Sequence, residues 1–229
     1  QYGPPPPPRK VPRHSDTWDA IEDQAYFSFE GLRELVKQAT NLKLTPKLES
    51  PKYTVLYRFA EYEVRRYEPY LVCETDTQRS EVTTGQGFNT LAAYIFGGNE
   101  REEKMSMTTP VFTSKPDTAS GGTTKMKFPV METKYDGEAK RLPAASAGGD
   151  VAVREAQGVV CAAISVPGLP LETEAKAAED RLRKALARDG YEAAIGEEEE
   201  CQLARYNEPF VPAPFRRNEV LIKLKNFKM

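Results

Sequence analysis

The sequence predicts an α+β fold in which one curved antiparallel sheet or barrel carries two helices on its outside. Three observations support this fold class. Residues 53–229 are mostly typical of strands, two windows have the helical period, and the order strand, strand, helix, further strands occurs twice. We therefore expect a barrel of two pseudo-repeated halves, preceded by an N-terminal extension over residues 1–52 that contributes one further helix.

Composition and charge limit the classes of partner. The 229 residues are 39% hydrophobic and 29% charged, which is typical of a globular chain with a sizeable core. Lys and Arg number 32 against 34 Asp and Glu, so neither sign accumulates enough to attract nucleic acid or an anionic bilayer. No stretch approaches the roughly 18 apolar residues of a membrane span. We expect no nucleic-acid partner and no membrane span.

The reactive side chains argue against catalysis. His14, in the Pro-rich tail, is the single histidine of the sequence, which argues against Ser-His-Asp, Cys-His and His-ligated zinc sites. Cys73, Cys161 and Cys201 are too few and too far apart for a disulfide framework or a zinc site. Cys73 and Cys161 occupy equivalent places in the two halves, inside apolar strands where thiols are usually inert. Neither a carboxylate pair nor a phosphate loop stands out, so we expect no enzyme, no catalytic residue and no bound metal.

The N-terminal extension has two parts. Five consecutive prolines, residues 4–8, followed by basic residues, predict a stiff, extended tail outside any core. Ser15 or Asp16 begins an amphipathic helix whose apolar residues recur at helical spacing from Trp18 to Val36. The apolar face of this helix either packs on the main domain or offers a partner protein a docking site within residues 1–41.

In the first half of the main domain, strands flank one helix. Phe88, Leu91, Ala92, Ile95 and Phe96 fall at i, i+3, i+4, i+7 and i+8, and the glycines at 97 and 98 end this helix. Alternation of apolar residues and β-propensity predict strands over residues 62–67, 70–73, 105–111 and 126–130.

The second half repeats this order. Strands are expected over residues 151–154 and 159–166, followed by a helix from Leu171 to Leu186 that Gly190 closes. The acidic run 197–200 is interpreted as a solvated loop. Residues 64–73 and 153–161 correspond closely once one residue is dropped, which predicts an internal duplication.

Several motifs together resemble one family. They are residues 62–67 (YEVRRY), 94–99 (YIFGGN), 104–111 (KMSMTTPV), 204–210 (ARYNEPF) and 214–220 (PFRRNEV). In their order and spacing, residues 53–224 resemble the SOUL heme-binding protein family. The motifs also have an architectural interpretation that requires no ligand. Residues 216–219 form a turn before the last strand, and the guanidinium groups of its two arginines satisfy carbonyls and carboxylates.

The resemblance implies a distorted β-barrel with two flanking helices, and heme or a related porphyrin bound in a shallow apolar patch. In this chain the implied contacts are Phe88, Leu91, Ala92 and Ile95 on the first helix of the domain, with Tyr206 and Phe210 from a later loop. The porphyrin plate requires apolar area, and its propionates require cations, for which Lys104, Lys127 and Arg79 are candidates. Because the domain contains no histidine, histidine cannot ligate the iron.

These observations leave more than one function open. The first is a non-catalytic carrier or buffer for heme or another tetrapyrrole. The alternative is a structural or interaction subunit of a larger plastid assembly, docked through the N-terminal extension; a small-molecule sensing module is a third class. The family occurs in plastids, and the chain opens on Gln1 rather than methionine. We therefore expect a chloroplast protein whose transit peptide has been removed, with a cytoplasmic location as the alternative.

Overall fold

The computed structural model describes most of the chain from residue 48 onward. The described residues are 48–77, 85–114, 124–131, 135, 138–146, 150–168, 170–194, 201–207, 211–212, 215–225 and 227. The Pro-rich tail, the helix expected after it and the acidic run 197–200 lie outside these residues. The domain boundary after residue 52 and docking through residues 1–41 therefore stay predictions.

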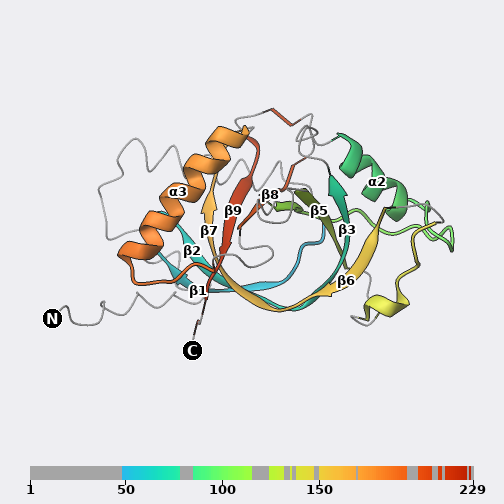
Figure 1. The fold of residues 1–229 in the computed structure, drawn as a ribbon, viewed down its shortest axis with the longest axis horizontal. Coiled ribbons are helices and arrows are strands. Elements are labelled where there is room, and N and C mark those ends of the chain that lie inside the picture. Colours follow the sequence, from blue (N-terminus) through green and yellow to red (C-terminus); the bar gives the residue numbers. More distant parts are fainter. Residues whose placement is uncertain are drawn as a thin grey trace, which may run out of the picture.

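The described residues form one antiparallel sheet of nine strands, curled into a half-barrel (Figure 1). The strands are β1 (Tyr53–Arg58), β2 (Glu63–Tyr67), β3 (Tyr70–Thr77), β4 (Val111–Ser114), β5 (Thr124–Val130), β6 (Ala152–Ala156), β7 (Val159–Ser165), β8 (Cys201–Arg205) and β9 (Asn218–Lys223). Their order across the sheet is β1-β2-β7-β9-β8-β4-β5-β3-β6.

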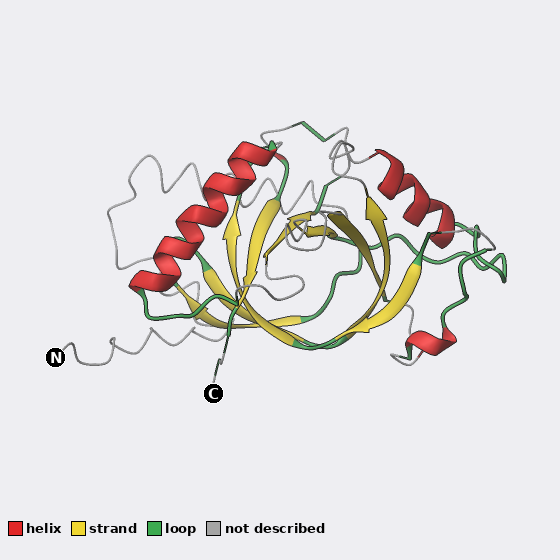
Figure 2. Ribbon diagram, viewed as in Figure 1, coloured by secondary structure: helices red, strands yellow, loops and turns green. Residues whose placement is uncertain are grey.

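Two α-helices lie on the outside of the curl, one against each half of the sheet (Figure 2). α2 (Gly85–Ile95) packs against β3 and β5, and α3 (Glu172–Arg188) packs against β7 and β9. A short 3-10 helix, η5 (Ala139–Arg141), lies beside β6. Neither α-helix of the described residues is long and apolar enough to cross a membrane. The predicted α+β class, with a curved antiparallel sheet and two outer helices, is confirmed.

The centre of the sheet is a pair of long, bent strands. β2 continues into β3, and β6 continues into β7, with β2 paired to β7 and β3 paired to β6. The pairing of Tyr67 with Val159 passes into that of Tyr70 with Ala156 without a shift in register. With β1 set aside, the order is β2-β7-β9-β8 from one end and β6-β3-β5-β4 from the other. This is the topology that a duplication produces, while the duplication of the sequence itself stays a prediction.

Alternate residues of each strand face opposite sides of the sheet, which divides the core. The cluster under α3 includes Val64, Ala162, Ile164, Val220 and Ile222 with Leu182 and Leu186. The cluster under α2 comprises Leu71, Cys73, Met126, Phe128 and Val130 with Leu91 and Ile95. A third cluster, inside the curl, comprises Tyr67, Phe112, Cys161, Ala163, Ala204, Tyr206 and Leu221. We refer to the side of the sheet that carries this third cluster as the inner face.

The two strand cysteines lie on opposite faces of the sheet. Cys73 packs under α2, whereas Cys161 lies on the inner face, so the expected equivalence of these residues is wrong. Ala162, the neighbour of Cys161, faces a helix in the way that Cys73 does. Burial raises the pKa of both thiols to about 12, which agrees with the expectation of unreactive thiols.

One expected strand is largely absent. Residues 104–110 form only isolated bridges, at Lys104 and Thr108, and the regular strand β4 starts at Val111. Pro110 lies directly before β4 and has no amide hydrogen to donate to a ladder, so the apolar alternation of this segment does not extend into regular pairing.

The glycines at the end of α2 act as predicted. Gly97 has a φ of 107°, and its N–H donates to the Tyr94 carbonyl at 3.4 Å. The Gly98 N–H donates to the Ala93 carbonyl at 2.7 Å. These two bonds form a Schellman motif, which ends the helix on a left-handed residue.

Gly98→Ala should lower the free energy of unfolding by about 1–3 kcal/mol. A Cβ at this position would stand 2.7 Å from the Ala93 carbonyl oxygen, so the helix end must shift. Gly85→Ala is the matched control, because no atom of the described part of the chain lies within 4 Å of a Cβ there. Urea unfolding followed by circular dichroism measures both variants. Equal stability of the two variants would contradict the close approach at Gly98.

Candidate functional site

The expected ligand face of α2 is mostly covered by the sheet. Leu91 and Ile95 are 0% and 2% exposed, and they fill the space between α2 and the strands that carry Cys73 and Phe128. The expectation that this face is open to solvent is therefore wrong for these two residues. Their assignment as ligand contacts stays a prediction, and it requires α2 to move away from the sheet.

A neighbouring stripe of the same helix remains accessible. Phe88 and Ala92 are half-buried, and the ring centroids of Phe88 and Phe128 lie 5.3 Å apart. Phe96 follows at the same spacing and is 57% exposed, with its N–H donating to the Ala92 carbonyl at 3.0 Å. We refer to Phe88, Ala92 and Phe96 as the α2 stripe. Phe96 was absent from the expected contacts, although its i+8 spacing from Phe88 was the signal for it.

One of the three candidate cations lies beside the α2 stripe. Lys104 is exposed and forms an antiparallel bridge with Phe96. Residues paired in this way carry their side chains on the same side, with Cβ atoms about 4.5–5.5 Å apart. Lys127 is buried, and its Nζ lies 3.8 Å from Glu74 Oε2 on the inner face, so it cannot reach the stripe. Arg79 lies outside the described residues.

The described methionines are all buried or half-buried, and Met107 packs against the same cluster as Phe88 and Ala92. Met105 and Met126 belong to the buried cluster under α2, while Met107 and Met131 are half-buried. In the part of the chain that the structure describes, no group of three or more His, Cys, Asp or Glu side chains is arranged to hold a metal ion. The α2 stripe therefore supplies an apolar surface with a cation at its edge.

The expected contacts from the later loop lie elsewhere. Tyr206 is buried on the inner face, the opposite side of the sheet from α2. Its hydroxyl donates to Glu219 Oε2 at 2.8 Å, and the Arg217 guanidinium carbon lies 4.0 Å from its ring centroid. These contacts give Tyr206 a structural role, and its contact with a ligand stays a prediction. Phe210 lies outside the described residues.

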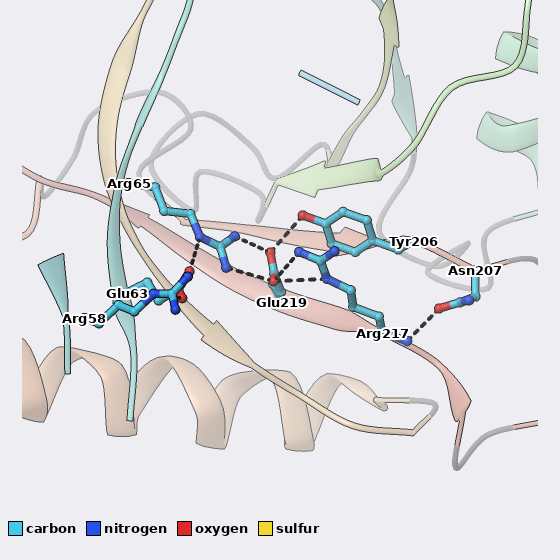
Figure 3. Close-up of polar contacts among 7 residues, drawn as sticks. All are labelled: Arg58, Glu63, Arg65, Tyr206, Asn207, Arg217 and Glu219. Atoms are coloured by element: carbon cyan, nitrogen blue, oxygen red, sulfur yellow. Dashed lines mark hydrogen bonds and ion pairs between the residues drawn. The ribbon is translucent and has the colours of Figure 1, made fainter. Parts of the chain in front are cut away.

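Tyr206 belongs to a buried charge cluster, shown in Figure 3. Arg65 from β2 donates through Nη1 and Nη2 to the two Glu219 oxygens, at 2.7 and 3.1 Å. Arg217 donates through Nη2 and Nε to Glu219 Oε1, at 2.8 and 3.2 Å. Arg65 Nε also reaches Glu63 Oε2 at 2.9 Å. One buried carboxylate therefore joins β2 to the last strand and to the segment before it.

The charges of this cluster are set by burial and by the arginines. Burial alone would raise the pKa of Glu219, but the hydrogen bonds and charge of Arg65 and Arg217 lower it to about 2. Burial, together with the Glu219 charge, raises the pKa of Tyr206 well above its ordinary value. At neutral pH Glu219 is thus ionised, and the Tyr206 hydroxyl is a donor.

The remaining residues of this motif also satisfy backbone groups. Arg216 Nε donates to the Val211 carbonyl at 2.6 Å. Asn218 Nδ2 donates to the carbonyls of Val166 and Gly168, at 3.2 and 2.7 Å. The expectation that the guanidinium groups of this motif satisfy carbonyls and carboxylates before the last strand is confirmed. This motif stabilises the fold.

The fold defines a class of domain in which a curled antiparallel sheet carries one helix on each half. The family model described as SOUL heme-binding protein matches residues 48–223, and the chain belongs to the SOUL family. This family is described as heme-binding. No curated protein sequence is similar enough to count as a match.

Solved structures share the architecture at very low sequence identity. An uncharacterized conserved protein from Listeria innocua has a TM-score of 0.53 at 9% identity, over 72% of this chain and 92% of that one. A hydrolase from Listeria innocua has a TM-score of 0.51 at 8% identity, with the same coverage of 72% and 92%. A chain from an EcmrR–DNA complex has a TM-score of 0.50 at 9% identity, over 93% of this chain and 77% of that one. At such identities these similarities show the fold alone.

Proposed function

We propose that this chain is a non-catalytic tetrapyrrole-binding protein that carries or buffers heme or a related porphyrin. The observation that carries the proposal is the exposed aromatic ring of Phe96 beside the cation of Lys104, at the end of the α2 stripe. Membership of a family described as heme-binding supports the ligand class.

The α2 stripe suits a flat, apolar ligand with carboxylates at its edge. Each Å² of apolar surface removed from water contributes about 25 cal/mol, so covering one face of a porphyrin supplies several kcal/mol. Lys104 offers a charge-assisted hydrogen bond to one propionate, and the other propionate stays in water. A shallow contact of this kind releases its ligand readily, as a carrier or a buffer requires.

The proposed binding does not depend on a histidine ligand to the iron. His14 is the single histidine of the chain and precedes the domain. The protein then recognises the porphyrin plate and a propionate rather than the metal. Hemin and metal-free protoporphyrin IX should therefore bind with similar affinity, which competition between the two in absorbance titrations measures.

Phe96→Asp should weaken hemin binding by at least about tenfold. The substitution removes an aromatic ring whose burial contributes about 1.5–3 kcal/mol, and it adds a negative charge beside the propionates. Absorbance titration of the purified chain with hemin gives the dissociation constant.

The control for this variant is Leu171→Asp. Leu171 is 66% exposed and directly precedes α3, on the other half of the sheet, so its substitution introduces the same charge away from the stripe. Hemin affinity should be unchanged in this control. The proposed site is wrong if Phe96→Asp binds hemin as the natural chain does, or if both substitutions weaken binding equally.

A further inference from the structure

The inner face of the sheet lines a partly open cavity that the proposed function does not use. Its volume is about 410 Å³, within the range of about 300–1,000 Å³ that is typical of small-molecule sites. The cavity lies where the two bent strands cross between the halves of the sheet, since its lining includes residues at both bends. α2 packs on the other side of the sheet. Among the lining residues are Tyr67, Tyr70, Phe112, Leu221, Arg154 and Lys223.

The lining combines aromatic walls with positive charge. Three aromatic rings and Leu221 supply apolar surface, and Arg154 and Lys223 are the charged residues of the lining. Among the described residues that line the cavity, none is an aspartate or a glutamate. A ligand that is apolar in its body and negatively charged at one end matches this combination.

The charged residues at and behind the cavity wall also carry a net positive charge. The buried Glu74 carboxylate accepts a hydrogen bond from Arg154 Nε at 3.0 Å, and Lys127 Nζ lies 3.8 Å from the same oxygen. These three residues together carry a net charge of +1. Excess positive charge in a partly desolvated interior favours an anion.

One lining residue, Tyr67, also carries a buried hydroxyl. Tyr67 is 4% exposed, and its Oη makes no hydrogen bond of regular geometry among the described residues, although the Arg65 guanidinium interacts with it. Burial raises the pKa of Tyr67, so the hydroxyl keeps its proton at neutral pH.

We propose that this cavity is a second binding site, for a small organic carboxylate with an aromatic or aliphatic body. The body of the ligand packs between the aromatic rings, and the carboxylate lies toward Arg154 and Lys223. This site is on the opposite face of the sheet from the α2 stripe, so it does not depend on tetrapyrrole binding.

The test uses two probes of similar shape and opposite charge. Isothermal titration calorimetry of the full chain with 2-naphthoate should give saturable, one-to-one binding. The amine with the same ring system, 2-naphthylmethylamine, should bind at least about tenfold more weakly, because it brings a cation toward Arg154 and Lys223. Equal affinity for the two probes, or no binding of 2-naphthoate at millimolar concentration, would overturn the proposal.

Substitutions locate the site. Ala156→Phe fills the cavity from its lining and should abolish 2-naphthoate binding, while thermal unfolding checks that the variant is folded. Lys223→Gln should weaken binding by about 3–10-fold through loss of a charge-assisted contact, and it serves as the test if Ala156→Phe does not fold. Lys184→Gln, an exposed position on α3, is the control and should bind 2-naphthoate as the natural chain does. Binding unaffected by both cavity substitutions would place the probe elsewhere and reject the site.

Hemin titrations separate this proposal from the tetrapyrrole site. Saturating 2-naphthoate should leave the hemin dissociation constant unchanged, and so should Lys223→Gln. If 2-naphthoate displaces hemin, the two ligands share one site and the second site is wrong. If hemin does not bind at all while 2-naphthoate does, the tetrapyrrole proposal fails and the cavity proposal stands.

Discussion

Replacing Glu219 with glutamine should lower the free energy of unfolding at pH 7 by about 3–5 kcal/mol. The substitution leaves the buried Arg65 and the half-buried Arg217 facing a neutral amide. It removes the carboxylate that two arginines share, which costs far more than the loss of an exposed ion pair. Urea unfolding followed by circular dichroism measures the effect. Glu155→Gln, at an exposed carboxylate on β6, is the control and should change stability by less than about 0.5 kcal/mol.

The same substitution has a pH signature. The pKa of Glu219 is about 2 in the folded chain against 4.5 in its ordinary state. Because the folded pKa is lowered, the stabilising contribution is fully present above pH 4.5 and is lost as the pH falls toward 2. Its size is about 3 kcal/mol. The stability difference between the natural chain and Glu219→Gln should therefore shrink over this window. A difference that stays constant from pH 7 to pH 2.5 would show that the carboxylate is not held by the arginines.

The helices and most strands could be predicted from sequence because the residue patterns that indicate them are local. The helical spacing from Phe88 to Phe96, the glycines after it and the alternation in the long strands depend on neighbours a few residues away. The strand expected over residues 105–111 failed on the same local rule, since alternation alone carries no information about pairing partners.

The charge cluster and the cavity could not be predicted because they depend on strand register. Arg65 and Glu219 are 154 residues apart in the chain, and they meet because β7 pairs with β2 on one side and with β9 on the other. The cavity wall likewise joins residues from both bent strands. The residues of the closing segment indicated that its arginines satisfy carboxylates, but they did not indicate which carboxylate.

The accessible side of α2 could not be read from periodicity either. The spacing defines a broad apolar face that includes Leu91, Ile95 and Phe96, and only the position of the sheet decides which of these side chains is covered. The sheet covers Leu91 and Ile95 and leaves Phe96 exposed. The proposed tetrapyrrole surface is therefore at the edge of the predicted face.

Leu91→Asp should lower the free energy of unfolding by more than about 4 kcal/mol, because it places a carboxylate in a fully buried apolar site. Ala93→Asp, at an exposed position of the same helix, is the matched control and should change stability by less than about 0.5 kcal/mol. Urea unfolding of both variants compares them directly. Similar stability of the two would show that α2 does not pack on the sheet through Leu91.

The truncation Leu91→Ala then separates a core residue from a ligand contact. It should cost about 2–5 kcal/mol through lost packing and the cavity left behind, and thermal unfolding identifies conditions under which the variant remains folded. If Leu91 only supports α2 from beneath, the folded variant binds hemin as the natural chain does, while Phe96→Asp does not. If α2 instead moves to let a porphyrin reach Leu91, the truncation weakens hemin binding in the folded protein. Hemin affinity of folded Leu91→Ala therefore decides whether the ligand lies on the α2 stripe or beneath the helix.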